Sequence, residues 1–518
     1  MTKERKPLYE PKTGIHRAKT WEIALYALNN TSTNMYQILL MYIMYFLSGI
    51  VGVGVVTAGM IVMALRIWDG VTDPFVGFIL DKTDGKYGRN RPFIVLGQLF
   101  MIVGTALIFL VCPRLSQVIR MPFYIICYMF FVMGYTSQCV VTKSAQSCLT
   151  NDETQRPLFT AFDIAYNGIV FVSIPVYVTS ILVPKYTVYD GAENIILDAF
   201  NNPAFFMELW IVCCIFSIVF AILAMIGIWR KDRTEFYGKS SVQTVTLADC
   251  WEVLKNNKPM KILCFSACTD KLTVIMQKNA VIMIMLFGII IGDYYLYSVF
   301  SIITGVLGVF VAISFMMFFG RKVGQKKALI VSSYGGIIGA IALFALLYFG
   351  NPRQISFQSI NLYTIAFILF FIIMKGFGNL STSIVIPMIA DCADYEVYRS
   401  GKYVPGLIGT LFSLIDKIIS SFASLFVGLA LAGIGFEKKL PTYTTPYSKD
   451  VFGVTMLFLI VAPIIGWIIN LISMRYYPLT KEKMATIHKS IVEIKAETKE
   501  QEEIKEKIWK ELGERNGE

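Results

Sequence analysis

Charged side chains are scarce in this sequence. Only 16% of its 518 residues are Asp, Glu, Lys or Arg, whereas 55% are hydrophobic and the mean hydropathy is +0.60. A soluble protein carries about 25% charged residues, so the composition excludes an ordinary soluble protein. Apolar runs long enough to cross about 30 Å of hydrocarbon recur along the whole chain. We therefore predict an all-α polytopic membrane protein.

The residues that build most metal and catalytic sites are also few. The two histidines, His16 and His488, lie in polar terminal regions, and the ten cysteines include no CxxC pair. Neither a disulfide framework nor a Cys/His metal site is expected. There is no HExxH motif, GxSxG elbow or phosphate-binding loop. We predict that the protein is not an enzyme and uses no cofactor.

The basic residues have a membrane explanation. Residues 1–20 are basic but contain no apolar stretch, so we expect no cleavable signal peptide. The net charge of +11 does not indicate nucleic acid, because Lys and Arg collect in the cytoplasmic loops of membrane proteins. Here they precede the first apolar segment and follow the second, sixth and eighth. This pattern predicts a multi-pass protein with both termini in the cytoplasm.

Twelve apolar segments predict twelve membrane helices. We expect them at residues 21–48, 53–80, 92–112, 122–146, 158–183, 205–229, 260–291, 294–319, 327–349, 362–390, 406–436 and 452–474. Similar basic loops follow the second segment of each group of six. This repeat predicts two six-helix bundles, at residues 1–229 and 260–479. A cytoplasmic loop at residues 230–259 joins them, and residues 480–518 form a charged cytoplasmic tail.

The second apolar segment contains two acids. Asp69 and Asp73 are four residues apart, and Arg66 precedes Asp69 by three, so all three share one helix face. An unpaired carboxylate in hydrocarbon costs at least about 2.5–3.5 kcal/mol. Two stacked carboxylates can bind Na⁺ together or share a proton. The alternative is that Asp69 pairs with Arg66, and Asp73 with a lysine, for structure alone.

Other polar residues lie within apolar segments. Lys417 could connect the two halves by reaching the paired acids, and Lys143 would suit an anionic substrate. Hydroxyl and amide side chains within apolar segments could bind a polyol. Together with one carboxylate and one thiol, the candidate substrate-binding residues are Thr33, Cys139, Asp163, Asn167, Gln277 and Asn379. The alternative for these residues is hydrogen bonding between helices.

Two charged clusters predict a cytoplasmic gate. One follows the second apolar segment and the other ends the tenth. Salt bridges between them would close the cytoplasmic side and break when the halves rock; a simple solvated face is the alternative. The gate candidates are Asp81, Asp84, Arg89 and Arg91 in the first cluster, and Asp391, Asp394, Glu396 and Arg399 in the second.

Several motifs resemble those of one transporter family. They are RIWDGVTDPFVG at 66–77, GRNRP at 88–92, Tyr135-Thr136, NDETQRPLF at 151–159, NKP at 257–259, IADCADYE at 389–396, and Lys417. Over nearly the whole chain, the sequence resembles the glycoside–pentoside–hexuronide:cation symporters, the melibiose-permease-like branch of the major facilitator superfamily. The resemblance implies the two-bundle fold of that superfamily, alternating access and secondary active symport across a bacterial inner membrane.

The resemblance also implies a cation site. The family builds it from acids on the second helix, a threonine on the fourth and a lysine on the eleventh, which match Asp69, Asp73, Thr136 and Lys417. Thr72 stands where the best-studied members have asparagine, so the choice among Na⁺, Li⁺ and H⁺ stays open. We expect Lys417 and Arg66 to couple this site to the substrate.

The sugar site of the family is matched poorly. Thr33, Cys139 and Lys143 stand where galactoside-binding members have aspartates and a tryptophan, which disfavours an α-galactoside. The substitutions make the pocket more positive, so we predict an acidic sugar such as a hexuronide, taken up with Na⁺ or H⁺ by a monomer. The alternative on the same fold is Na⁺-coupled transport of another organic anion or a lysolipid.

Overall fold

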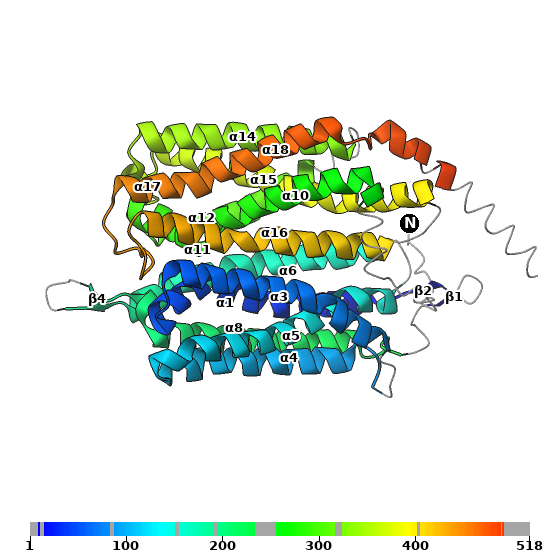
Figure 1. Cartoon of the computed structure of the whole chain (residues 1–518), viewed down its shortest axis with the longest axis horizontal. Helices are drawn as coiled ribbons and strands as arrows, with labels where there is room; N and C mark the ends of the chain where they lie inside the picture. The colour runs from blue at the N-terminus through cyan, green and yellow to red at the C-terminus, as the bar shows by residue number, and fades with distance from the viewer. Residues whose placement is uncertain are drawn as a thin grey trace, which may run out of the picture.

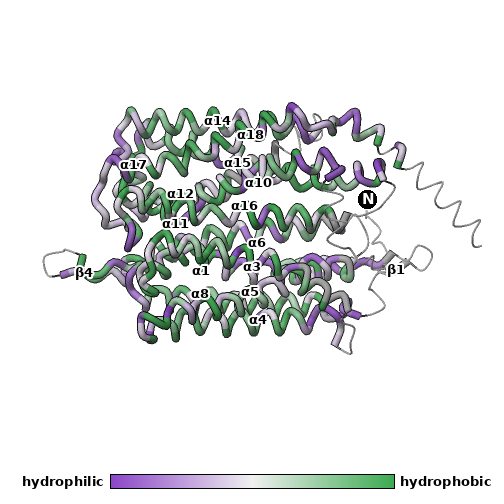
Figure 2. The backbone as a smooth tube through the Cα atoms, viewed as in Figure 1, coloured by the Kyte–Doolittle hydropathy of each residue, from purple (hydrophilic) through white to green (hydrophobic). Residues whose placement is uncertain are grey.

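The computed structural model describes residues 9–10, 15–82, 87–150, 155–190, 195–233, 255–315, 324–400, 405–487 and 489–491. Its long helices run along one common direction and form two bundles, one from each half of the chain (Figure 1). Hydrophobic residues dominate the middle of the helices, and hydrophilic residues gather toward their two ends (Figure 2). These features confirm the predicted all-α polytopic class.

The N-terminal half has six long helices. They are α1 (Thr20–Met41), α3 (Val55–Lys82), α4 (Arg91–Ala106), α5 (Gln117–Leu149), α6 (Arg156–Tyr177) and α8 (Pro203–Ile228). Short segments extend or connect them: α2 (Ile43–Tyr45), η1 (Phe46–Val51), η2 (Leu107–Val111), η3 (Cys112–Arg114), η4 (Val178–Leu182), α7 (Val183–Tyr186) and η5 (Ala199–Asn201). Two small antiparallel pairs join β1 (Tyr9–Glu10) to β2 (Ile15–His16), and β3 (Val188–Tyr189) to β4 (Ile195–Leu197).

The C-terminal half repeats this plan. Its long helices are α10 (Lys258–Gln277), α12 (Leu296–Phe315), α14 (Gln325–Phe349), α15 (Leu362–Ser400), α16 (Pro405–Gly433) and α18 (Ala462–Tyr476). The shorter segments are α11 (Ala280–Ile284), η7 (Met285–Ile291), η9 (Pro352–Gln354), α17 (Lys449–Met456) and η10 (Leu457–Val461). Asparagines cap α8 and α10, each of which has a proline in its first two positions: Asn202 accepts a hydrogen bond from the Ala204 amide, and Asn257 from that of Met260.

Nine helices in the described part of the chain are long and apolar enough to cross a membrane. Two further spans are bent helix pairs: α1 with residues 43–51, at 44°, and α10 with the helix over residues 280–291, at 45°. The span expected at residues 294–319 falls on α12, which contributes a shorter apolar helix over Leu296–Gly305. The total of twelve spans therefore stays a prediction.

The two bent spans end in the same way. In each, a π-helical segment is followed by a glycine in the left-handed region, Gly52 with φ of 82° and Gly292 with φ of 91°. Residues with a Cβ rarely adopt this conformation. These are the first spans of their halves, so the shared geometry supports the internal repeat read from the loops.

Both described ends of the chain lie at the same end of the molecule. The β1–β2 pair and the last turns of α18 are found together on the right of Figure 1. We call this the terminal end and the opposite one the far end. A chain that enters and leaves at one end crosses the bundle an even number of times.

Helices and one loop join the two halves. Helix α3 packs against α16, and α6 packs against α12. At the far end, the loop after α16 lies over the N-terminal half, where the Tyr45 hydroxyl donates to the Pro441 carbonyl at 2.7 Å. The Val55 amide donates to the Glu437 carbonyl at 2.8 Å. These contacts hold the far end closed.

Glycines allow the close approach of α3 and α16 toward the far end. A Cβ on Gly59 would lie 2.7 Å from the Ser424 carbonyl oxygen and 3.1 Å from Leu425 Cα. A Cβ on Gly428 would lie 3.0 Å from the Val55 carbonyl oxygen. These neighbours are backbone atoms of packed helices, so they cannot move aside by a change of rotamer.

We expect Gly59→Ala to destabilise the far-end closure. Overpacking typically costs about 1–3 kcal/mol, which exceeds the gain in helix propensity of at most about 1 kcal/mol. Thermal unfolding of the purified protein should therefore show a lower midpoint for this variant. Gly168→Ala is the control, because a Cβ there meets nothing within 4 Å. A Gly59→Ala midpoint equal to that of the control would contradict the prediction.

Candidate cation site and substrate cavity

An ion cluster joins the two halves near the middle of α3 and α16. The Lys417 ammonium lies 2.9 Å from Asp69 Oδ2 and 2.6 Å from Asp73 Oδ2. The two acids are one turn apart on α3, so a single ammonium from α16 reaches both. Their side chains are 17% and 26% exposed, and that of Lys417 is 24% exposed. Two carboxylates and one ammonium leave a net charge of −1, which a monovalent cation would neutralise.

Two threonines extend this cluster toward α5. The buried Thr136 hydroxyl donates to Asp69 Oδ1 at 3.1 Å and lies 3.2 Å from the Thr72 hydroxyl. The Thr72 hydroxyl in turn donates to the Asp69 carbonyl at 3.0 Å. Carboxylate, hydroxyl and carbonyl oxygens of this kind are the ligands that hard cations prefer. The donor set therefore fits Na⁺, and the paired carboxylates fit a proton equally well.

Arg66 does not take part in this cluster. In the part of the chain that the structure describes it is half-buried and makes no ion pair with Asp69, although the two are one turn apart. Asp69 and Asp73 instead share Lys417 from the other half. Of the two pairings in the purely structural alternative, the structure lacks that of Asp69 with Arg66 and contains that of Asp73 with a lysine, Lys417. A coupling role for Arg66 stays a prediction.

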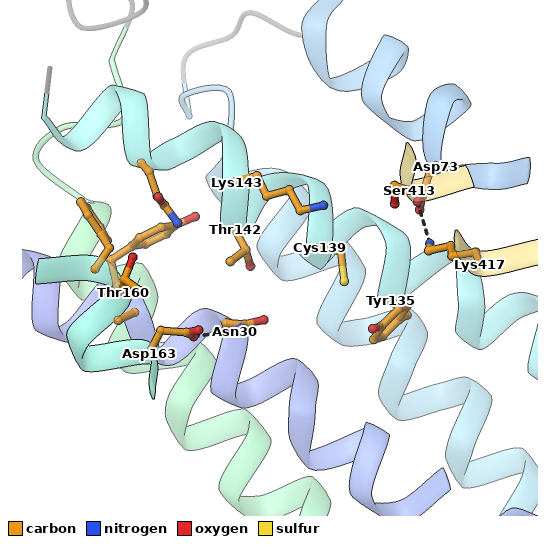
Figure 3. Close-up of a pocket in the computed structure, with 14 residues that line it drawn as sticks. Asn30, Asp73, Tyr135, Cys139, Thr142, Lys143, Thr160, Asp163, Ser413 and Lys417 are labelled. Carbon is orange, nitrogen blue, oxygen red and sulfur yellow. Dashed lines mark hydrogen bonds and ion pairs between the residues drawn. The ribbon is translucent and has the colours of Figure 1, made fainter. Parts of the chain in front are cut away.

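A cavity of about 360 Å³ lies beside the ion cluster. Figure 3 shows Asp73 and Lys417 at one side of it and Asp163, bound to Asn30, at the other. Its walls come from α1, α3, α5, α6 and α16. The lining residues are Tyr26, Ala27, Asn30, Asp73, Tyr135, Cys139, Thr142, Lys143, Gln146, Phe159, Thr160, Asp163, Ser413 and Lys417.

Helix α5 supplies the largest share of the lining. Tyr135, Cys139, Thr142, Lys143 and Gln146 recur at three- and four-residue spacing, so they form one face of the helix. That periodicity is readable in the sequence, and it would have added Tyr135, Thr142 and Gln146 to the candidate residues. The lining residues from α1 and α6 have no comparable signal, because each helix contributes only a few.

Four of the predicted substrate residues line the cavity: Cys139, Lys143, Asp163 and Lys417. Asn167 lies behind them and donates to Asp163 Oδ1 at 2.8 Å. Thr33 is outside the lining, buried, and donates to the carbonyl of Asn29 one turn earlier. Gln277 and Asn379 also lie outside it, in the C-terminal half, where each accepts a hydrogen bond from a lysine.

Comparison with known proteins shows the family to which this chain belongs. The family described as MFS/sugar transport protein matches residues 26–481. The chain belongs to this family. The match covers both halves, including the ion cluster and the cavity.

Named relatives of the transporter are distant but cover its whole length. A "Glucuronide carrier protein homolog" of Escherichia coli is 22% identical over 95% of this chain and 99% of the relative. An "Isoprimeverose transporter" of Lactiplantibacillus pentosus is 22% identical over 92% and 93%. Among solved structures, the nucleoside transporter NupG superposes with a TM-score of 0.56 at 11% identity, covering 89% of this chain and all of NupG. That likeness concerns the fold alone.

Two of the described ion pairs of the predicted gate residues each lie within one half of the transporter. Arg91 pairs with Asp232 at 3.3 Å and lies over the Trp229 ring. Arg399 pairs with Glu396 at 2.5 Å, one turn away on α15. Asp84 and the side chain of Asp81 lie outside the described residues. Arg89, Asp391 and Asp394 all take part in interactions, and a gate between the halves stays a prediction.

Asp232 is the residue that sequence reasoning missed at this end. It is fully buried and accepts hydrogen bonds from the backbone amides of Arg89, Asn90 and Arg91, and from the Asn90 side chain. The turn that precedes α4 therefore folds around a carboxylate from the end of α8. Nothing in the sequence marks this acid among the charges of the following loop.

Thr136→Val should weaken binding of the coupling cation. The substitution keeps the shape but removes the hydroxyl that contacts Asp69, and a hydrogen bond to a charged group contributes about 1.5–3 kcal/mol. We expect about a 10- to 150-fold rise in the cation concentration that gives half-maximal uptake. Thr136→Ser, which keeps the hydroxyl, should stay close to the unmodified protein. Equal cation dependence of the two variants would exclude Thr136 from the site.

Proposed function

We propose that this protein is a secondary active symporter that couples Na⁺ or H⁺ entry to uptake of a sugar-like solute, with an acidic sugar preferred. The ion cluster carries the proposal: Asp69, Asp73 and Lys417 hold a net charge of −1 between the two halves. Family membership and relatives named as a glucuronide carrier, an isoprimeverose transporter and a glycoside/cation symporter support it.

Neutralisation of this cluster provides the coupling step. The contact between α3 and α16 must change when the halves rock, and an unbalanced buried charge makes that change costly. A cation bound at Asp69 and Asp73 removes the imbalance. Lys417 also lines the cavity, so the same side chain contacts both sites. Cation and solute then raise each other's affinity by the same factor.

We infer that the terminal end faces the cytoplasm of a bacterium and the far end faces outward. Basic residues precede α1 and follow α3, α8 and α12 in the sequence, and α1 begins and α3 ends at the terminal end. The cavity lies toward this end, since Tyr26 and Phe159 are close to the starts of α1 and α6. With the far end closed, the conformation is inward-facing. One chain forms both sites, which supports a functional monomer.

The cavity favours a sugar over a lysolipid. About 360 Å³ is at the small end of the range of small-molecule sites. Hydroxyls, amides and charged groups form much of its wall, and the partly exposed ring of Tyr135 offers a flat face for a pyranose. Lys143 is exposed in this wall, whereas Asp163 accepts hydrogen bonds from Asn30 and Asn167. The accessible charge of this wall is therefore positive and favours an anionic solute over a neutral one.

Uptake driven by a cation gradient should be lost in Asp69→Asn and in Asp73→Asn. In either variant the remaining carboxylate and Lys417 neutralise each other without a cation. No cation then needs to bind, so a cation gradient cannot drive transport. We expect at least a tenfold drop in Na⁺- or H⁺-driven uptake of methyl β-D-glucuronide into proteoliposomes.

Asp450→Asn is the matched control for these variants, because Asp450 is exposed in the first turn of α17. Its uptake should equal that of the unmodified protein. Gradient-driven uptake that survives in both Asp69→Asn and Asp73→Asn would show that the ion cluster is structural and that coupling takes place elsewhere.

A further inference from the structure

The seventh span is interrupted in the middle of the C-terminal half. Helix α10 ends at Gln277, and α11 begins at Ala280 with a bend of 45° between them. Asn279 caps the new start by accepting a hydrogen bond from the Val281 amide at 3.0 Å. Interrupted helices at membrane depth are tolerated where they are buried in protein or line a water-filled space. The break places Lys278 at the junction.

Two lysines connect this junction to α15. The Lys278 ammonium donates to Asn379 Oδ1 at 3.2 Å, and the Lys375 ammonium donates to Gln277 Oε1 at 3.0 Å. The hydrogen bonds run in opposite directions between the two helices. Gln277 and Lys278 are neighbours in sequence, and Lys375 and Asn379 are one turn apart, so both ammonium groups belong to one small cluster. Lys375 also lies 5.6 Å from the centre of the Phe371 ring.

Both lysines lack a carboxylate partner among the described residues. Each is held by one neutral amide, whereas Lys417 of α16 pairs with Asp69 and Asp73, and Lys271 of α10 pairs with Asp416. The acid that shares α10 with Lys278, Asp270, is two turns away and accepts a hydrogen bond from Ser381 at 2.7 Å. The cluster therefore carries unbalanced positive charge within the membrane.

Exposure shows that this charge is accessible. The Lys278 side chain is exposed although it lies near the middle of its span. An ammonium directed at lipid at that depth costs at least about 2.5–3.5 kcal/mol, which favours an orientation of Lys278 toward water over one toward lipid. Lys375 is half-buried beside it.

We propose that Lys278 and Lys375 form an anion subsite that binds the carboxylate of an acidic sugar. This inference rests on the proposed function and names the part of the C-terminal half that selects the substrate. A carboxylate placed between the two ammonium groups forms charge-assisted hydrogen bonds with them. It also offsets their positive charge, which the neutral amides of Gln277 and Asn379 do not. Gln277 and Asn379 hold the lysines in position, and the Phe371 ring forms an apolar wall.

The test is equilibrium binding of D-glucuronate and D-glucose to the purified full-length protein, read by ligand-dependent thermal stability. We expect glucuronate to bind more tightly than glucose. Lys278→Gln and Lys375→Gln should each weaken glucuronate binding about 10- to 100-fold, as expected for a lost charged hydrogen bond, and leave glucose binding unchanged. Lys278→Arg should keep the preference, which separates loss of charge from misfolding.

A matched control and an inorganic anion complete the test. Lys449→Gln removes an exposed lysine at the start of α17 and should leave glucuronate binding unchanged. Potassium chloride at equal concentration should not raise the unfolding temperature as glucuronate does. The subsite is overturned if both Gln variants keep the glucuronate preference, if glucuronate does not stabilise the unmodified protein, or if chloride reproduces its effect.

Gradient-driven uptake separates this inference from the proposed function. If glucuronate binding depends on the two lysines but a cation gradient drives no uptake, the subsite is supported and symport is rejected. Cation-driven uptake with the same preference for acidic sugars in both Gln variants would leave symport standing and reject the subsite.

Discussion

The salt bridges of Lys417 to Asp69 and Asp73 are the interaction on which the rest of the structure depends. They join α3 of one half to α16 of the other at membrane depth, beside the cavity. Alone they would lock the halves together with an unbalanced charge. A bound cation changes that balance, so the contact that holds this conformation is also the one that a coupling ion can alter.

The far end imposes a second constraint. Gly59 and Gly428 bring the backbones of α3 and α16 together there, and the loop after α16 closes over Tyr45 and Val55. The ion cluster lies further along the same helix pair, toward the terminal end. A single interface thus combines rigid backbone packing near one end with a charge-dependent contact near its middle. This arrangement suits a movement in which the halves pivot rather than separate.

Much of this architecture was predictable from the sequence, because it follows from hydrophobic length and helical spacing. The apolar runs predicted the helices, and the spacing of Asp69 and Asp73 placed both acids on one face. Lys417 was predicted to reach them, and the structure shows that contact. The bend at residue 42 could not be predicted, since neither proline nor a polar run marks it, whereas the polar run Gln277-Lys278-Asn279 marks the other bend. Gln277 and Asn379 have residue types that suit a sugar, but only the three-dimensional fold shows that they hold lysines outside the N-terminal cavity. Asp232 was missed for a similar reason, because its buried role depends on a turn that is distant in sequence.

Helix α16 carries opposite charges at consecutive positions. Asp416 is buried and pairs with Lys271 of α10, while Lys417 pairs with the acids of α3. Consecutive residues on a helix point about 100° apart, so the helix is anchored in two directions at one level. Turning it about its own axis would break both anchors at once, whereas tilting it needs neither to break. The two ion pairs therefore hold the helix more firmly against rotation about its own axis than against tilting.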